Sequence, residues 1–557
     1  MNTNFKPLGL AAAVAAATAG YAGVANAQAV EIAAESVLGD LALVPYYTVR
    51  EGYATGLSII NTADRTQVIK IRLRRAADSM DAMDWNVVLS PEDVYTGTIT
   101  TQGNDIIWRS NDNSCTAPEA VGGVLTMPAL FRNGAEEGYI EIISMGSPLD
   151  ETYPIAEAAE HGSDGFPADC DRVRDNFRAN DDDVLFAYAK SGFQFSSVDD
   201  IRGVIHSGMT NQWDVDEDGD PIVGDAVPNF YDASPDSLKV SYFIKSDETG
   251  VEFGNNAVHF AGHLEGASMT NQQLGVFDGD FQGFDHPDLN GGAPLTALAL
   301  GGAPNQVAPP GGYAPPDGSK VAGRGRYEQV RNVVGAEALI NDWSQNQNGP
   351  FSVDTDWVVT VPGQYLMTDL FNYIESVFDA DVDCRIGDPN LVNEDPDADD
   401  PENTCDFRDI PLTADFEVFD REERSIVVEE GDLVVSPQPP TPQIERVLDK
   451  EVNVIQWGNS PVLNAGAFIE VPKPSGAAFG WANLAVKPDD DKTQAICDVD
   501  LANSNEEDGL AWVCDETDSP VPLIGFVAWQ RNFDDLPAAN YGRIVEHSRV
   551  IASSSAP

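Results

Sequence analysis

The sequence predicts a mainly β protein of antiparallel, sandwich-like sheets with long acidic loop insertions and few short helices. Short runs of alternating apolar and polar residues, separated by turn residues, recur from position 41 almost to the end of the chain. Helical periodicity is scarce, and long polar stretches divide the runs. Many short strands with Gly/Pro turns are typical of sandwich architecture.

The first expected strands follow closely on one another. Residues 41–49 and 56–61 read as two strands joined by a Glu51-Gly52 turn. A third strand is expected at 67–75, after a turn at 61–65. Further strands are expected at 85–89, 94–100, 138–144, 238–245, 357–361, 425–435, 452–457, 467–471, 523–529 and 541–551, and helices at 155–160 and 327–343.

The segment 67–75 alternates most clearly, which predicts a half-buried strand. Its basic face either grips an anionic ligand or pairs with the protein's own surplus carboxylates, and we expect the second. The apolar members are Ile69, Ile71 and Leu73, and the basic members are Lys70, Arg72 and Arg74.

Three long polar inserts interrupt the strands, at 111–183, 278–324 and 379–409. Such stretches exceed ordinary connections and are either binding loops or mobile decoration. We expect an N-terminal β region at 28–235, carrying an acidic insert and a calcium-like loop. A C-terminal β region at 236–557 carries an acidic, disulfide-closed insert. The two regions are either separate or one composite body.

Residues 1–27 are expected to be a signal peptide. Lys6 begins a short basic region, residues 8–20 are Ala-rich and apolar, and Ala25-Asn26-Ala27 gives a small-x-small cleavage pattern. No later stretch holds the roughly 18 consecutive apolar residues of a membrane-spanning helix. We therefore expect an extracytoplasmic location: the cell surface, the medium or the periplasm.

The chain is extremely acidic, with 91 Asp and Glu against 32 Lys and Arg and a formal net charge of −59. Such a surface repels phosphate backbones and anionic lipid. Nucleic acid is therefore excluded as an expected partner, whereas divalent cations and cationic partners fit.

Six cysteines in an exported chain predict three disulfides. No C-x-x-C spacing occurs, which argues against a redox motif or a Cys-rich zinc site. Proximity along the chain favours pairing of neighbours: Cys115 with Cys170, Cys384 with Cys405, and Cys497 with Cys514.

Residues 214–225 resemble a calcium-binding loop of the EF-hand type. Calcium takes about six to eight oxygen ligands, and alternating Asp side chains on a tight loop converge on one point. The segment is either such a calcium site or a solvated acidic turn, and we expect calcium. Pro221 and the final Asp, where Glu is usual, depart from the pattern. The expected ligands are Asp214, Asp216, Asp218, Asp220 (through its carbonyl) and Asp225.

Enzyme motifs are mostly missing from the sequence, and we expect a protein that is not an enzyme. His259 and His263 are four apart but lack the Glu of a helical zinc motif, and no nucleophile elbow, phosphate loop or dinucleotide fingerprint occurs. A pair of carboxylates for glycoside hydrolysis remains open, because separation in space is not readable from sequence.

Five segments resemble a set of uncharacterised exported proteins of Gram-negative bacteria, loosely called cell-surface proteins. The resemblance implies export and a single composite β body, and it implies no catalytic residue. The segments are 44–49 (VPYYTV), 59–62 (IINT), 357–362 (WVVTVP), 451–455 (EVNVI) and 522–527 (PLIGFV).

We therefore expect an exported structural or adhesive protein of the cell surface or the extracellular space, stabilised by calcium and disulfides. Its partner would be an undefined surface or matrix component, and its oligomeric state stays open. One alternative is an extracellular hydrolase acting on polysaccharide, and another is a periplasmic ligand-binding module. The second alternative needs two α/β lobes, which the scarcity of helical patterns disfavours.

Overall fold

The computed structural model confirms the mainly β fold with antiparallel sheets and short helices. The residues it describes are 37–175 (without 78, 80 and 130), 231–264, 267, 287–289, 291, 325–363, 412–426, 444–458 (without 449), 461–488, 495–505, 509–516 and 521–551 (without 534).

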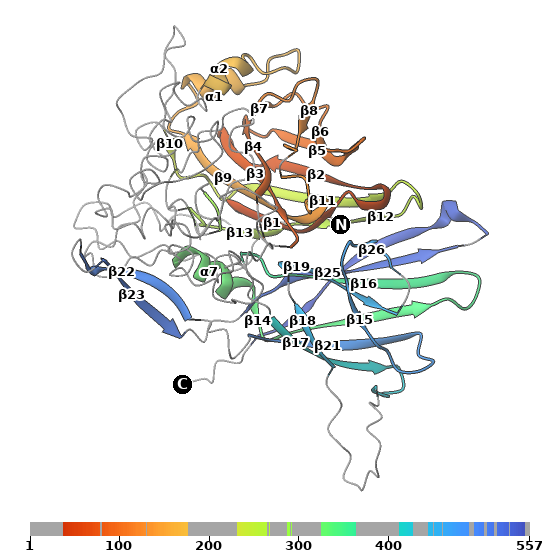
Figure 1. The fold of residues 1–557 in the computed structure, drawn as a ribbon. Coiled ribbons are helices and arrows are strands. Elements are labelled where there is room, and N and C mark those ends of the chain that lie inside the picture. Colours follow the sequence, from red (N-terminus) through yellow and green to blue (C-terminus); the bar gives the residue numbers. More distant parts are fainter. Residues whose placement is uncertain are drawn as a thin grey trace, which may run out of the picture. The chain divides into compact units, whose positions relative to one another are not determined.

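Two sheets form the first sandwich (Figure 1). Sheet 1 has the order β13-β1-β9-β3-β4-β7, with β10 on β9, and sheet 2 has the order β12-β11-β2-β5-β6-β8. The sheet 1 strands are β1 (Leu41–Thr48), β3 (Gln67–Arg75), β4 (Asp81–Leu89), β7 (Cys115–Ala117), β9 (Glu137–Pro148), β10 (Tyr231–Asp232) and β13 (Val258–Phe260). The sheet 2 strands are β2 (Tyr53–Asn61), β5 (Val94–Gln102), β6 (Asp105–Arg109), β8 (Val124–Thr126), β11 (Leu238–Ser246) and β12 (Glu252–Asn256).

Aromatic side chains fill the space between sheets 1 and 2. The rings of Trp85 on β4 and Trp108 on β6 lie 5.1 Å apart, and the Trp108 indole N–H donates to the Tyr95 hydroxyl at 2.7 Å. Ile69 and Ile71 join the same buried cluster. The period-two pattern of the sequence therefore points its apolar face into this core, as predicted.

The basic face of β3 is also buried, so the prediction of a half-buried strand is wrong. All nine residues of β3 are buried, because other segments cover the second face of sheet 1. Val68 packs in one cluster with α1 (Pro154–Ala159) and α2 (Cys170–Asp175), whereas Ile143 packs in another with α7 (Gly325–Val334). The period-two pattern identified the core face but not the cover on the other side.

Ion pairs with the protein's own carboxylates neutralise this basic face, as predicted. Lys70 Nζ lies 2.5 Å from Asp84 Oδ2, and Arg72 Nε lies 2.7 Å from Asp81 Oδ2. Glu141 accepts both Arg72 and Arg74, each at 3.1 Å. We call these six side chains the buried ionic layer.

The segment 111–183 is not an insert throughout. It contains β9, which lies between β1 and β3 in sheet 1 and pairs with both. The helix expected at 155–160 is present as α1. The strand expected at 138–144 is therefore confirmed as part of β9, although the composition of the surrounding stretch is acidic on average.

The second sandwich is formed by β15 to β21 and β25 to β27 (Figure 1). Sheet 3 has the order β18-β17-β21-β15 with β27 on β15, and sheet 4 has the order β20-β19-β16-β25-β26. The sheet 3 strands are β15 (Ala338–Asn346), β17 (Leu412–Asp420), β18 (Ile444–Leu448), β21 (Phe479–Pro488) and β27 (Ser548–Val550). The sheet 4 strands are β16 (Ser352–Thr360), β19 (Val452–Trp457), β20 (Ile469–Val471), β25 (Ile524–Asn532) and β26 (Tyr541–Glu546).

Sheets 3 and 4 face each other across a tryptophan cluster and join at one end. Trp343 on β15 stacks on Trp457 of β19 at 5.6 Å, and Trp357 on β16 meets Trp457 edge-on at 5.3 Å. Residues 345–346 of β15 pair with 353–354 of β16. Two small ribbons accompany the sandwich: β14 (Gly335–Ala336) with β24 (Val521–Pro522), and β22 (Ala495–Asn505) with β23 (Gly509–Glu516).

The prediction of a helix over 327–343 is wrong for the second half of this segment. The helix α7 ends at Val334, and Gly335 begins β14 before the chain enters β15. Residues 338–344 pair with β21, so cross-strand partners determine their conformation. The strand expected at 541–551 is divided at His547 into β26 and β27, and residues 427–435 of the strand expected at 425–435 lie outside the described residues.

The two sandwiches share one hydrophobic cluster. Val358 and Phe526 of sheet 4 belong to the cluster that also contains Tyr53 and Val44. The Thr360 hydroxyl donates to the Pro45 carbonyl at 2.6 Å. The strands β11, β12 and β13 lie beyond position 235 and pair with β2 and β1, so the first sandwich continues to Phe260.

Within the described residues, no helix has the length and apolar character needed to cross a membrane.

Candidate functional site

A cavity of about 530 Å³ opens where the two sandwiches meet. One wall is the short turn η1 (Arg50–Gly52), between β1 and β2, together with Glu248. The other wall is the end of β19 and the loop that leads to β20. We call this the inter-sandwich cavity, and its main polar and aromatic lining residues are Arg50, Glu51, Glu248, Gln456, Asn464, Phe468 and Glu470.

The Arg50 side chain lies against the opposite wall. The Thr48 hydroxyl accepts the Arg50 backbone N–H at 3.2 Å, and Glu51 (φ 46°) and Gly52 (φ 76°) turn the chain back. A Cβ at Gly466 would lie 2.6 Å from the guanidinium carbon of Arg50, so a larger residue at this position would displace the Arg50 side chain. The buried Arg50 Nε has no hydrogen-bond partner among the described residues.

Gln456 contributes an amide to the lining of the cavity. On β19, Val452 and Val454 pack in the cluster of the first sandwich, whereas Ile455 and Trp457 pack in the tryptophan cluster of the second. By alternation, Gln456 points towards the first sandwich, on the cavity side. The residue is only 3% exposed.

Asp356 lies behind Gln456, as its directly opposite partner on β16. Its Oδ2 accepts the backbone N–H groups of Val462 and Leu463, each at 2.9 Å. The Tyr53 hydroxyl donates to the Val462 carbonyl at 2.5 Å. The loop that forms one cavity wall is therefore fixed from both sandwiches.

Burial raises the pKa of Asp356 to about 7, although the amide hydrogen bonds from Leu463 and Val462 favour its charged form and Asp354 adds repulsion. Its Oδ1 is buried and lacks a hydrogen-bond partner among the described residues. Asp356 is thus a buried carboxyl group that exchanges its proton near neutral pH.

The outer part of the cavity is acidic and carries one aromatic ring. The Phe468 side chain is 52% exposed, and Asn464 adopts a left-handed backbone with φ 51°. The lining carboxylates outnumber the single guanidinium by three to one. Such a lining suits hydrogen bonding of a polar ligand that carries no negative charge. Within the described residues, no group of three His, Cys, Asp or Glu side chains is arranged to hold a metal ion.

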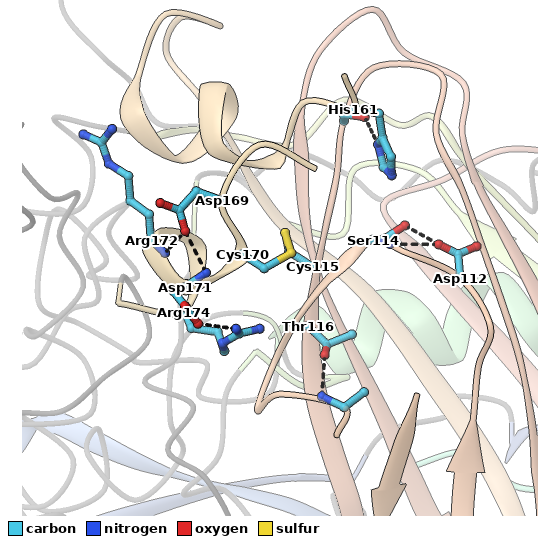
Figure 2. The surroundings of a disulfide bond; sticks show 12 residues. Asp112, Ser114, Cys115, Thr116, His161, Asp169, Cys170, Asp171, Arg172 and Arg174 are labelled. Atoms are coloured by element: carbon cyan, nitrogen blue, oxygen red, sulfur yellow. Dashed lines mark hydrogen bonds and ion pairs between the residues drawn. A yellow bond between two sulfur atoms is a disulfide. The ribbon is translucent and has the colours of Figure 1, made fainter. Parts of the chain in front are cut away.

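The disulfide between Cys115 and Cys170 is present, as predicted, with the two Cα atoms 5.1 Å apart. Figure 2 shows it linking β7, at the edge of sheet 1, to the first turn of α2. Asp169 accepts the backbone N–H groups of Asp171 and Arg172 at 3.1 Å each, which fixes the start of α2. The crosslink therefore fastens the helical cover onto sheet 1.

The other expected site residues are only partly placed. Cys497 and Cys514 are directly opposite each other on β22 and β23. The remaining predicted disulfide residues, Cys384 and Cys405, lie outside the described residues, as do the expected calcium ligands Asp214, Asp216, Asp218, Asp220 and Asp225.

The histidines singled out in the sequence are structural. His259 Nε2 accepts the Val240 backbone N–H at 2.8 Å, and His263 Nε2 lies 2.7 Å from the Asp288 carbonyl. Burial lowers the pKa of each to about 4, so both are neutral at physiological pH.

The inter-sandwich cavity was not predicted from the sequence. The available signal was the turn-rich segment 458–466 after a buried strand, because loops beside rigid strands often carry binding residues. Nothing in the sequence linked that loop to Arg50.

In comparisons with known proteins, no family model, no curated protein and no solved structure matches this chain.

Proposed function

We propose that this protein is exported and acts at the cell surface or in the extracellular space as a structural or adhesive component, stabilised by disulfides and calcium. The observation that carries the proposal is the Cys115–Cys170 disulfide within a β-sandwich. Disulfides of this kind persist in oxidising compartments and are rare where thiols are kept reduced. The leader-like residues 1–27 point to the same destination.

The calcium part of the proposal rests on the sequence pattern at 214–225 and on the charge balance. A net charge of −59 opposes a compact state through self-repulsion. Calcium bound by clustered carboxylates would neutralise part of that charge and order the segment that holds it.

The adhesive role is supported by the inter-sandwich cavity. Its lining combines a buried guanidinium Nε without a partner among the described residues, an amide and an exposed ring, which are groups that hold a ligand. A polysaccharide-acting hydrolase is the second candidate, because Glu51, Glu248 and Glu470 contribute carboxylates to the same cavity.

Fractionation of the native organism, with calcium and chelator washes, tests the location. The processed chain should appear in the surface or culture fraction, with Cys115 and Cys170 resistant to alkylation until a reductant is added. Full-length protein in the cytosol with alkylated cysteines would contradict the proposal. Release of reducing sugar from a polysaccharide, lost in E51Q, E248Q or E470Q, would favour the hydrolase instead.

A further inference from the structure

We propose that the inter-sandwich cavity is a saccharide-binding site for uncharged or amine-bearing polysaccharide. The inference rests on the proposed adhesive function and names the chemical class of the surface or matrix partner. It starts from the buried Arg50 Nε–H, which has no hydrogen-bond partner among the described residues, and from the Gln456 amide, which lines the same cavity.

A buried polar group is costly when it is unpaired, so the Arg50 Nε–H indicates a ligand that supplies an acceptor. A primary amide offers one acceptor and two donors in a plane, and a guanidinium offers donors only. Neighbouring hydroxyls on a sugar ring each donate and accept, and they match such planar groups two at a time. Gln456 and Arg50 approach the cavity from different sandwiches, so the ligand would contact both.

Phe468 provides an apolar surface beside the polar groups of the cavity lining. Its side chain is 52% exposed although it is large and aromatic, and it belongs to the cavity lining. One face of a pyranose ring presents C–H groups, which pack against an aromatic face and leave the hydroxyls at the ring edge for the polar lining. The volume of about 530 Å³ falls within the range of roughly 300–1,000 Å³ typical of small-molecule sites.

Charge decides between classes of saccharide. Glu51, Glu248 and Glu470 outnumber Arg50, and the whole chain carries −59. Uronate-rich, sulfated or phosphorylated polymers would be repelled by this field. Neutral sugars escape the repulsion, and an amino sugar gains an attraction to the carboxylates.

A cationic peptide is the rival ligand that the same charge allows. Peptide-recognition sites of the common kinds use a free sheet edge, an apolar groove or an aromatic-lined proline track. The inter-sandwich cavity instead presents side-chain amides, carboxylates and one isolated ring. The lining therefore favours a saccharide.

Isothermal titration calorimetry of the exported, disulfide-bonded protein tests the inference. The probes are neutral gluco- and manno-oligosaccharides, glucosamine oligomers, oligogalacturonate and oligolysine. We expect binding of a neutral or glucosamine probe and no detectable binding of oligogalacturonate. F468A and Q456L should each weaken the binding at least tenfold.

F166A is the matched control, because Phe166 is similarly exposed (56%) but belongs to the segment between α1 and α2. It should bind like the unaltered protein. Because Phe468 is exposed, F468A is expected to fold, and its urea transition verifies this. Binding of oligolysine alone, binding of no probe, or saccharide binding that survives both F468A and Q456L would overturn the inference. A surface-located, disulfide-bonded protein with any of these results would leave the proposed function standing.

Discussion

Lys70 Nζ lies 2.5 Å from Asp84 Oδ2, and each of these side chains is only 1% exposed. The pair belongs to the buried ionic layer, which separates two apolar patches on the covered face of sheet 1. Burial raises the pKa of Glu141 in this layer, the guanidinium groups of Arg74 and Arg72 lower it, and the net shift is downward. Each charge in the layer is therefore stabilised by an opposite charge within the same layer.

Removing one member of the Lys70–Asp84 pair should destabilise the protein strongly. K70M leaves Asp84 charged and buried, which costs about 3–5 kcal/mol of unfolding free energy in comparable cases. The double variant K70M/D84L removes both charges and should recover most of the loss. Urea unfolding measures both effects.

K239M is the control for that experiment, because Lys239 pairs with Asn256 in an exposed position. It should change the unfolding free energy by less than about 1 kcal/mol. A K70M variant as stable as K239M would show that the ionic layer does not stabilise the fold.

Loss of the Cys115–Cys170 disulfide should loosen the helical cover. The bond closes a segment with a sequence separation of 55, for which the chain-entropy model gives about 4 kcal/mol. The double variant C115S/C170S should unfold at lower urea concentration, and brief proteolysis should cut between α1 and α2 first. Cleavage of C115S/C170S and of the unaltered protein at the same sites and rates would show that the disulfide does not hold the helical cover in place.

Asp356 should make stability depend on pH in a definite direction. Its pKa is about 7 in the folded protein and near 3.8 in the unfolded chain. The folded state therefore binds the extra proton between these values, and unfolding free energy rises as pH falls from 8 towards 4. Burial lowers the pKa of His259, His263 and His547 to about 4, which acts in the opposite direction.

The comparison with D356N isolates Asp356, because the histidines are common to both proteins. The stability of the unaltered protein relative to D356N should increase by about 1.6 kcal/mol between pH 7 and pH 5.5. D354N removes the neighbouring carboxylate whose repulsion raises the pKa of Asp356, so it should move the pH profile to lower pH without abolishing it. Parallel profiles for D356N and the unaltered protein would show that Asp356 does not titrate in this range.

Local patterns predicted the strands well. The segments 67–75 and 452–457 coincide with β3 and β19, because alternation along a strand is a property of the strand itself. The covered face of β3 was not predictable, since α1, α2 and α7 come from distant parts of the sequence. The helix predicted at 338–343 was wrong for the same reason, because pairing with the distant strand β21 determines the structure of these residues.

The candidate site was harder to predict than the fold. Arg50 and Gln456 are separated by more than four hundred positions and lie on different sandwiches, and neither belongs to a recognisable motif. The clustered Asp residues attracted attention because calcium ligands occur at fixed local spacing. A cavity assembled by tertiary packing leaves no such spacing in the sequence.

Calcium should stabilise the mature protein through residues 214–225. A ligand at about one hundred times its dissociation constant adds roughly 2.7 kcal/mol. A chelator should therefore lower the melting temperature, and D216N/D218N should abolish the response to calcium. D395N/D397N removes the same charge from another acidic stretch and should retain it. Equal responses in the two variants would show that calcium only screens the overall charge.

Cys497 and Cys514 should form the crosslink of the β22–β23 ribbon. The two residues are direct partners in the antiparallel register, and opposite residues in such a pair have Cα atoms about 4.5–5.5 Å apart. A disulfide needs about 4.4–6.8 Å, so the backbone is already within range. Non-reducing peptide mapping should recover a Cys497–Cys514 peptide beside the Cys115–Cys170 peptide. A crosslink from Cys497 to Cys384 or Cys405 would contradict the pairing of Cys497 with Cys514.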